Sequence, residues 1–144
     1  MIFINEYAKE LYEFIIDVNR EIMEDKNQKS IHEFKIINEG SLIDYCNSLY
    51  GTIPFSDEYY CKTFEEGIAL TIFRLNTSHC FLDGNKRTTL LTVIKLIENS
   101  EYKNFSNDFF VGVLTQFLIE MLEDKLNEKK ILKWVIKQFK SNMI

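Results

Sequence analysis

The strongest constraint on the fold of this chain is the spacing of its apolar residues, which recur every three or four positions over most of its 144 residues. Such spacing puts apolar side chains on one face of an α-helix. It predicts amphipathic helices over about residues 5–24, after the candidate N-cap Ser106, and near the end of the chain. The apolar sets are Tyr7, Leu11, Phe14, Ile15, Val18 and Ile22; Phe109, Phe110, Val113, Leu114, Phe117, Leu118, Met121 and Leu122; and Ile131, Leu132, Val135, Ile136 and Phe139.

Two further helices are apolar almost all round, over about residues 59–76 and 85–99, which is typical of buried central helices. A shorter helix is expected to begin at Ser41, with Asp44 at the capping-box position, and to end at Gly51. These patterns predict an all-α bundle.

Two segments lack a helical pattern. Residues 24–30 are polar and are expected to form a loop, with His32 on the surface just beyond them. Residues 52–57 hold the only proline together with turn-forming residues, and they predict an extended or β-hairpin-like flap. With no internal repeat or long linker, and 46% apolar residues to build one core, the chain is expected to form a single domain over residues 1–144.

Net charge, apolar patterning and cysteine content argue against nucleic-acid binding, membrane contact and a cysteine-bound metal. A net charge of -5 and a pI near 5.1 argue against a surface that neutralises nucleic-acid phosphates. Charged residues interrupt every long apolar stretch, and the N-terminus has no signal-peptide pattern, so we expect a cytoplasmic protein with no membrane contact. The three cysteines have no metal-binding spacing and are expected to be reduced and structural.

The stretch from His79 to Arg87 places a histidine, an aspartate and two basic residues within nine positions, between the two apolar helices. Gly84 and Asn85 stand at the expected start of the second helix, where free N–H groups and the helix dipole favour anions. Lys86 and Arg87 add two cations at the same end. The combination is typical of a polyphosphate-binding site.

Three other residues of this stretch have distinct expected roles. Asp83 is a hard oxygen ligand that suits Mg²⁺ shared with nucleotide phosphates. His79 suits a general base that takes a proton from a hydroxyl. Phe81 is expected to anchor the loop in the core. Taken singly, each feature also has a plain structural reading, as a turn, a structural histidine or solvated charge.

The run His79-Cys80-Phe81-Leu82-Asp83-Gly84-Asn85-Lys86-Arg87-Thr88 resembles the signature of the Fic/Doc family in its Doc-type form. The usual Fic signature is His-Pro-Phe-x-(Asp/Glu)-Gly-Asn-Gly-Arg-x-x-Arg. This chain departs from it at Cys80, Lys86 and Leu90, which replace proline, the second glycine and the last arginine. The resemblance covers about residues 38–100.

The resemblance implies a helical domain and an enzyme that uses ATP and Mg²⁺. His79 would be the base, Asp83 the metal ligand, and Gly84, Asn85, Lys86 and Arg87 the phosphate-binding set. Lysine at position 86 and leucine at position 90 favour a Doc-type kinase, which transfers the γ-phosphate of ATP to a hydroxyl of a target protein. In this family the flap before the motif docks the target as an added strand, which would give that role to Thr52, Ile53 and Phe55. The alternative is that this segment only connects two helices.

The resemblance also implies partners. No Ser/Thr-x-x-x-Glu-Gly/Asn inhibitory motif occurs in the chain, so a toxin restrained in trans by a separate antitoxin is expected. For Doc-type toxins the target is translation elongation factor Tu, whose modification arrests translation. Two alternatives stay open: AMP transfer to a protein hydroxyl, and a catalytically silent binding domain.

Overall fold

The computed structural model describes residues 2–25, 27, 32–102 and 104–142. These residues form six α-helices and one π-helix: α1 (Glu6–Glu24), α2 (Glu39–Tyr50), α3 (Phe64–Thr77), α4 (Asn85–Glu98), η1 (Phe109–Leu114), α5 (Thr115–Glu123) and α6 (Glu128–Asn142). Within the described ranges, β pairing is limited to two isolated bridges, Ile36 with Phe81 and Thr52 with Tyr59. The expected all-α fold is confirmed.

The helices begin where polar side chains satisfy their first free N–H groups. Asn5 caps α1 and Thr63 caps α3 through their side-chain oxygens. Asn38 caps α2 and accepts the N–H of Ser41, so the prediction that Ser41 is itself the cap was wrong. The helix starts two residues before Ser41 because Asn38, and not Ser41, has the non-helical backbone and the free side-chain oxygen of a cap.

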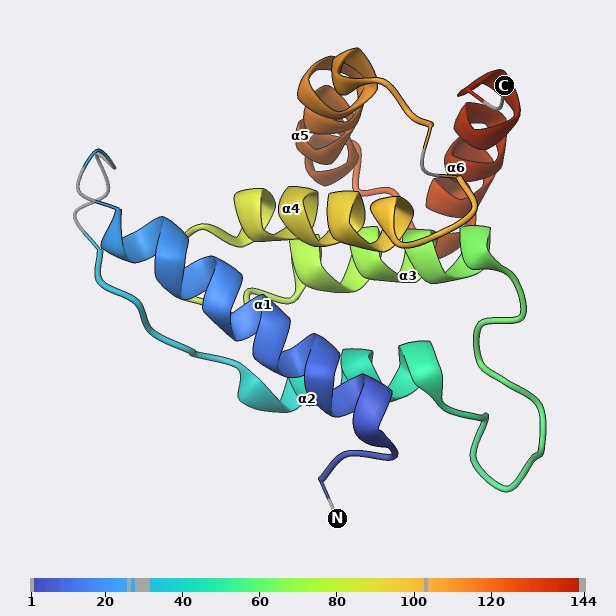
Figure 1. Ribbon diagram of the computed structural model, residues 1–144, viewed down its shortest axis with the longest axis horizontal. Helices are drawn as coiled ribbons and strands as arrows, with labels where there is room; N and C mark the ends of the chain where they lie inside the picture. The colour runs from blue at the N-terminus through green and yellow to red at the C-terminus, as the bar shows by residue number, and fades with distance from the viewer. Residues whose placement is uncertain (1, 26, 28–31, 103, 143–144) are drawn as a thin grey trace.

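Helix α3 lies at the centre of the fold, with α1 and α2 on one side and α5 and α6 on the other, while α4 runs beside it (Figure 1). One hydrophobic cluster joins α3 and α4 to η1, α5 and α6. The second joins α1, α2 and α3 to Cys80 and Phe81 of the motif. The motif is therefore built into the core that α1 and α2 cover.

One predicted helix start and one predicted core residue need correction. Helix α3 begins at Phe64 and not near residue 59, because residues 51–60 form a hairpin-like loop in which the Tyr60 N–H bonds to the Gly51 carbonyl at 3.1 Å. Tyr7 does not join the buried stripe of α1, since its side chain is 67% exposed and Ala8 is buried instead.

The helix expected after Ser106 includes the π-helical segment Phe109–Leu114 before α5. The Thr115 hydroxyl, at the start of α5, donates to the Phe110 carbonyl of this segment at 3.0 Å. Ser106 accepts the N–H of Phe109, as an N-cap does. None of the helices in the described part of the chain is both long enough and apolar enough to span a membrane.

Candidate functional site

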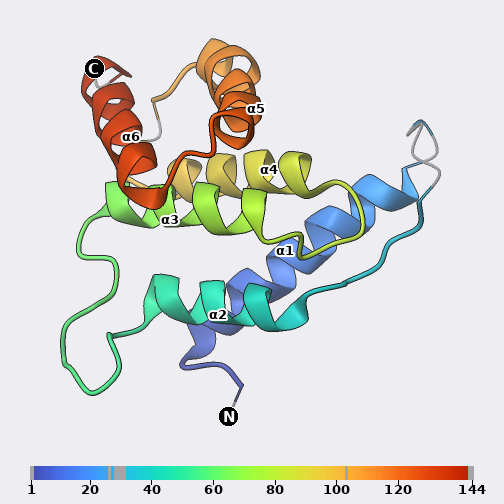
Figure 2. The same ribbon diagram turned by 180° about the vertical axis from the view of Figure 1, so that it is seen from behind.

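The motif forms the loop that joins the C-terminal end of α3 to the N-terminal end of α4 (Figure 2). His79 is exposed and has a φ of 47°, a left-handed conformation that is uncommon for a residue with a side chain. Such backbone strain persists only where neighbouring contacts enforce it, and it is frequent at functional sites.

The contacts that enforce this conformation come from residues 35–38, which we call the strap. The strap runs antiparallel to the motif: the N–H groups of Ile37 and Asn38 bond to the Cys80 carbonyl at 2.8 and 3.1 Å, and the Leu82 N–H bonds to the Lys35 carbonyl at 2.9 Å. The Asn38 side chain donates to the Ser78 carbonyl at 3.2 Å. The Ser78–His79 peptide and the Cys80–Phe81 peptide, which lie before and after His79, are thus held by the strap.

Below His79 the loop is anchored by apolar burial. Cys80 and Phe81 are each 1% exposed, and the Phe81 ring lies 6.2 Å from that of Phe34. This burial agrees with the core-anchoring role expected for Phe81. Burial also raises the pKa of the Cys80 thiol to about 11, so this neighbour of His79 is a protonated, unreactive thiol at neutral pH.

The side chain of Asn85 closes the loop on itself. Its carbonyl oxygen accepts the Phe81 N–H at 3.1 Å, and its amide donates to the Phe81 carbonyl at 2.8 Å. The side-chain oxygen and one amide hydrogen of Asn85 thus already have partners, whereas its backbone N–H stands at the N-terminal end of α4, where helix N–H groups lack a partner within the helix.

Gly84 precedes α4 with a φ of 78°, a left-handed conformation that glycine adopts without strain. Its N–H donates to Oδ1 of Asp83 at 2.7 Å, so the carboxylate lies at the N-terminal end of the helix. A side chain at position 84 would meet Nδ2 of Asn19 at 3.1 Å and Sδ of Met23 at 3.3 Å. Helix α1 therefore supports the motif from beneath.

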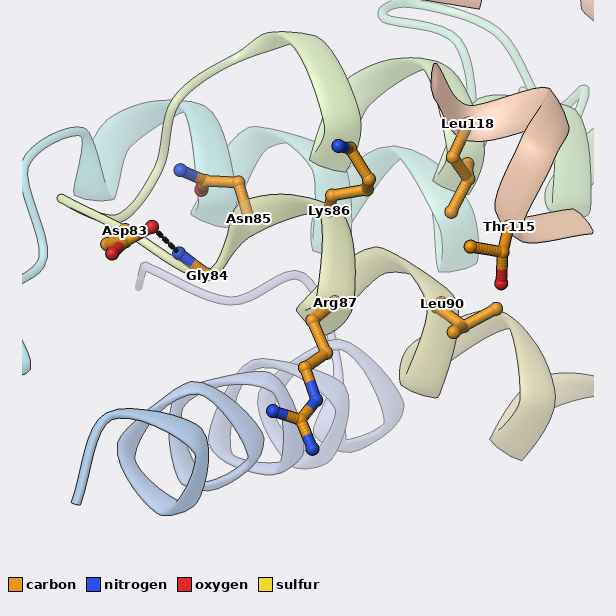
Figure 3. A pocket seen from close by; sticks show the side chains of 8 residues that line it. All are labelled: Asp83, Gly84, Asn85, Lys86, Arg87, Leu90, Thr115 and Leu118. Atoms are coloured by element: carbon orange, nitrogen blue, oxygen red, sulfur yellow. Dashed lines mark hydrogen bonds between the residues drawn. The ribbon is translucent and has the colours of Figure 1, made fainter. Parts of the chain in front are cut away.

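A cavity of ≈ 430 Å³ opens at this helix end, between α4 and α5 (Figure 3). Its lining residues are Asp83, Gly84, Asn85, Lys86, Arg87, Leu90, Thr115 and Leu118. Lys86 and Arg87 leave α4 in different directions, with Arg87 directed toward α1, where it also borders a second hollow with Glu21, Glu24 and Asp25. The structure thus gathers the predicted metal ligand and phosphate-binding set around one cavity, whereas His79 is not among the lining residues.

The residues present suit a metal that is shared with a nucleotide. No group of three or more His, Cys, Asp or Glu side chains that could hold a metal ion occurs in the described part of the chain. Asp83 is the one carboxylate among the cavity-lining residues. Mg²⁺ is commonly held by one or two carboxylates together with substrate phosphates, so this donor set fits Mg²⁺ carried by a polyphosphate.

Thr52, Ile53 and Phe55 do not lie at the motif. Their hairpin precedes α3 and the motif follows it, and both views place the two at opposite ends of that helix (Figures 1 and 2). A helix of this length separates its ends by about 21 Å. The expectation that these three residues hold a target beside His79 is therefore corrected, because the segment that pairs with the motif is the strap.

Sequence reasoning missed several residues that shape the site. They are Asn19, the strap, Thr115 and Leu118. Of these residues, only Asn19 could have been identified from the sequence, because it is a polar residue four positions after Ile15 on the apolar face of α1. The strap and the α5 residues carry no local pattern that marks them.

The sequence model described as the Fic/DOC family matches residues 10–97, more than half of the chain. Comparisons with curated proteins and with solved structures give no match. The matched range includes most of α1, the strap, α3 and the whole motif. The chain belongs to the Fic/DOC family, whose members typically modify proteins by nucleotide transfer and generally use ATP with a divalent metal.

Proposed function

We propose that this protein is a Doc-type kinase that transfers the γ-phosphate of ATP to a hydroxyl of another protein. The observation that carries the proposal is the pair Lys86 and Leu90, one helical turn apart on the wall of the cavity. Lys86 is exposed, and within the described part of the chain no hydrogen bond or ion pair occupies its ammonium group. A cation at the glycine position and an apolar side chain at the last arginine position favour phosphoryl transfer over AMP transfer.

In this proposal the chain positions groups and neutralises charge, which is most of what phosphoryl transfer requires. His79 takes the proton of the target hydroxyl, whose oxygen bonds to the γ-phosphorus; the bond between that phosphorus and the bridging oxygen breaks, and ADP leaves with the electron pair. The N-terminal end of α4, Lys86 and Arg87 hold the phosphates. A Mg²⁺ bound by Asp83 and the phosphates would offset their negative charge.

The strap is the proposed docking edge for the target. Its Lys35 carbonyl and Ile37 N–H face the motif. The N–H and C=O of Ile36 make no hydrogen bond to any described residue, which leaves an edge on which an extended peptide can add as a strand. A peptide bound there would lie on the edge of the strap that faces away from the motif, about 4.8 Å from the strap, so its hydroxyl side chain would have to reach past the strap to His79.

The proposed setting is a toxin–antitoxin pair, with translation elongation factor Tu as the target and arrest of translation as the result. The absence of an inhibitory motif in the sequence supports an antitoxin that acts in trans. A target in the translation machinery would place the protein in the cytoplasm.

The decisive test incubates the purified protein with Mg²⁺, cell extract and ATP labelled at the γ- or the α-phosphate. We expect a γ-labelled band with an added mass of about 80 Da that is absent with His79→Ala. An α-labelled product, heavier by about 329 Da, would establish AMP transfer instead. No labelled product, together with unchanged growth arrest by His79→Ala, would favour a binding domain.

A second test separates the roles of Lys86 and of net charge. Lys86→Ala is expected to weaken ATP binding and transfer, whereas Lys130→Ala removes an exposed lysine of α6 and is the matched control. Equal effects of the two substitutions would contradict a specific role for Lys86.

The docking edge is tested with Ile36→Pro, which removes the N–H that would pair with the target, and with Ile36→Val as the control for side-chain size. We expect Ile36→Pro to raise the KM for the target protein and to leave ATP affinity unchanged. If Phe55→Ala has that effect and Ile36→Pro has none, the hairpin is the docking segment.

A further inference from the structure

Asn19 of α1 is a fully buried polar residue that contacts the motif across the core. Its Nδ2 donates to the backbone carbonyl of Asp83 at 2.9 Å and to Oγ1 of Thr88 at 3.1 Å. One bond therefore reaches the loop and the other reaches the first turn of α4. Asn19 ties α1 to both sides of the helix end that borders the cavity.

The bond to Asp83 fixes the orientation of one particular peptide group. The carbonyl of the Asp83–Gly84 peptide is held by Asn19, and the N–H of the same peptide donates to the Asp83 carboxylate at 2.7 Å. Rotation of this peptide would break both bonds. The side chain of Asn19 thus determines, through one peptide plane, where the N–H that holds the carboxylate points.

Fold stability alone does not account for asparagine at this position. Its Oδ1 is buried and has no hydrogen-bond partner in the described part of the chain. A buried acceptor without a partner is unfavourable, and an apolar side chain of the same size would avoid it. The contacts of Nδ2 with the motif are the feature that an apolar residue would lose.

We propose that Asn19 is a positioning residue that orients the Asp83 carboxylate and the N-terminal end of α4 for binding of Mg²⁺ and ATP. The choice of Mg²⁺ and ATP as ligands rests on the proposed function. The orientation of the Asp83–Gly84 peptide, in contrast, can be measured in the ligand-free protein. Residues that orient a metal-binding side chain typically change affinity or activity by roughly 10- to 100-fold when replaced.

The test is Asn19→Leu, which keeps the branching of the side chain at Cγ and removes both hydrogen bonds that Nδ2 donates. Asn76→Leu is the matched control, because Asn76 is also buried, donates one bond to the Leu118 carbonyl and has an unpaired Oδ1, but makes no hydrogen bond to the motif in the described part of the chain. The first readout is the amide signal of Gly84 in the ¹H–¹⁵N spectrum of the ligand-free protein. The second is the affinity for Mg²⁺ with ATP, measured by calorimetry.

We expect Asn19→Leu to displace the Gly84 signal and to weaken Mg²⁺-dependent ATP binding by roughly 10-fold or more, while Asn76→Leu leaves the Gly84 signal in place. An unchanged Gly84 signal in folded Asn19→Leu, or an equal displacement in Asn76→Leu, would overturn the inference. If Asn19→Leu does not fold, Thr88→Val removes one acceptor of Asn19 and must displace the same signal by a smaller amount. A wild-type protein that binds no ATP would refute the proposed function, whereas the Gly84 readout would still decide the role of Asn19.

Discussion

Replacing Gly84 with alanine tests whether the left-handed turn at the start of α4 is as tightly determined as its surroundings indicate. The residue has a φ of 78°, and an added Cβ would lie 3.1 Å from Nδ2 of Asn19, 3.3 Å from Sδ of Met23 and 3.5 Å from Cγ2 of Ile22. The substitution therefore adds backbone strain and crowds the side chain that holds the motif.

The expected loss follows from three contributions. A left-handed backbone is unfavourable for alanine by roughly 1–2 kcal/mol. The reduced freedom of the unfolded chain offsets about 0.4–1 kcal/mol of this loss. Crowding in a packed core adds about 1 kcal/mol, at the low end of the range for overpacking, because the nearest atoms are side-chain ends that can shift. The free energy of unfolding should fall by about 1–2.6 kcal/mol.

Urea denaturation of Gly84→Ala measures this loss, and Gly40→Ala is the matched control. Gly40 lies in the first turn of α2 with nothing within 4 Å of an added Cβ, so alanine there is expected to leave stability unchanged or to increase it. Unchanged stability in Gly84→Ala, or equal losses in the two variants, would refute the argument that the turn requires glycine.

Three further predictions concern other parts of the structure. Burial raises the pKa of Cys46 to about 12 and that of Cys80 to about 11 from an ordinary 9.0, so above pH 9 the unfolded chain releases thiol protons that the folded chain keeps. The free energy of unfolding should therefore fall as the pH rises from 9 toward 11; urea denaturation across this range that shows no fall would contradict it. Phe139→Ala should lower the free energy of unfolding by about 3–5 kcal/mol, because Phe139 is 3% exposed and its ring lies 5.9, 4.9 and 5.0 Å from the rings of Phe64, Tyr102 and Phe105. A loss below about 1 kcal/mol would refute its place in the core. Phe117→Leu should change the fluorescence of Trp134, the only tryptophan, because the two rings stack at 3.7 Å; an unchanged emission spectrum would contradict this stacking.

The sequence predicted the helices because helical periodicity is a local property. The ranges expected for α1 and α4 agree with the structure to within a residue. The apolar pattern that predicts such a helix depends only on residues that are close in sequence. The start of α3 was predicted too early because its apolar pattern continues backward into the hairpin, where tertiary contacts hold Tyr60 to Gly51.

The chemistry of the motif was also local, because nine consecutive residues carry it. Only the tertiary structure decided which distant segments support that motif. Asn19 reaches Asp83 across 64 positions of sequence, and Asn38 reaches Ser78 across 40. Both contacts depend on how α1 and the strap pack against α3 and α4, and periodicity within one helix says nothing of which helices become neighbours. The same reason places Thr52, Ile53 and Phe55 at the far end of α3: closeness in sequence to the motif did not make them close in space, because a whole helix lies between.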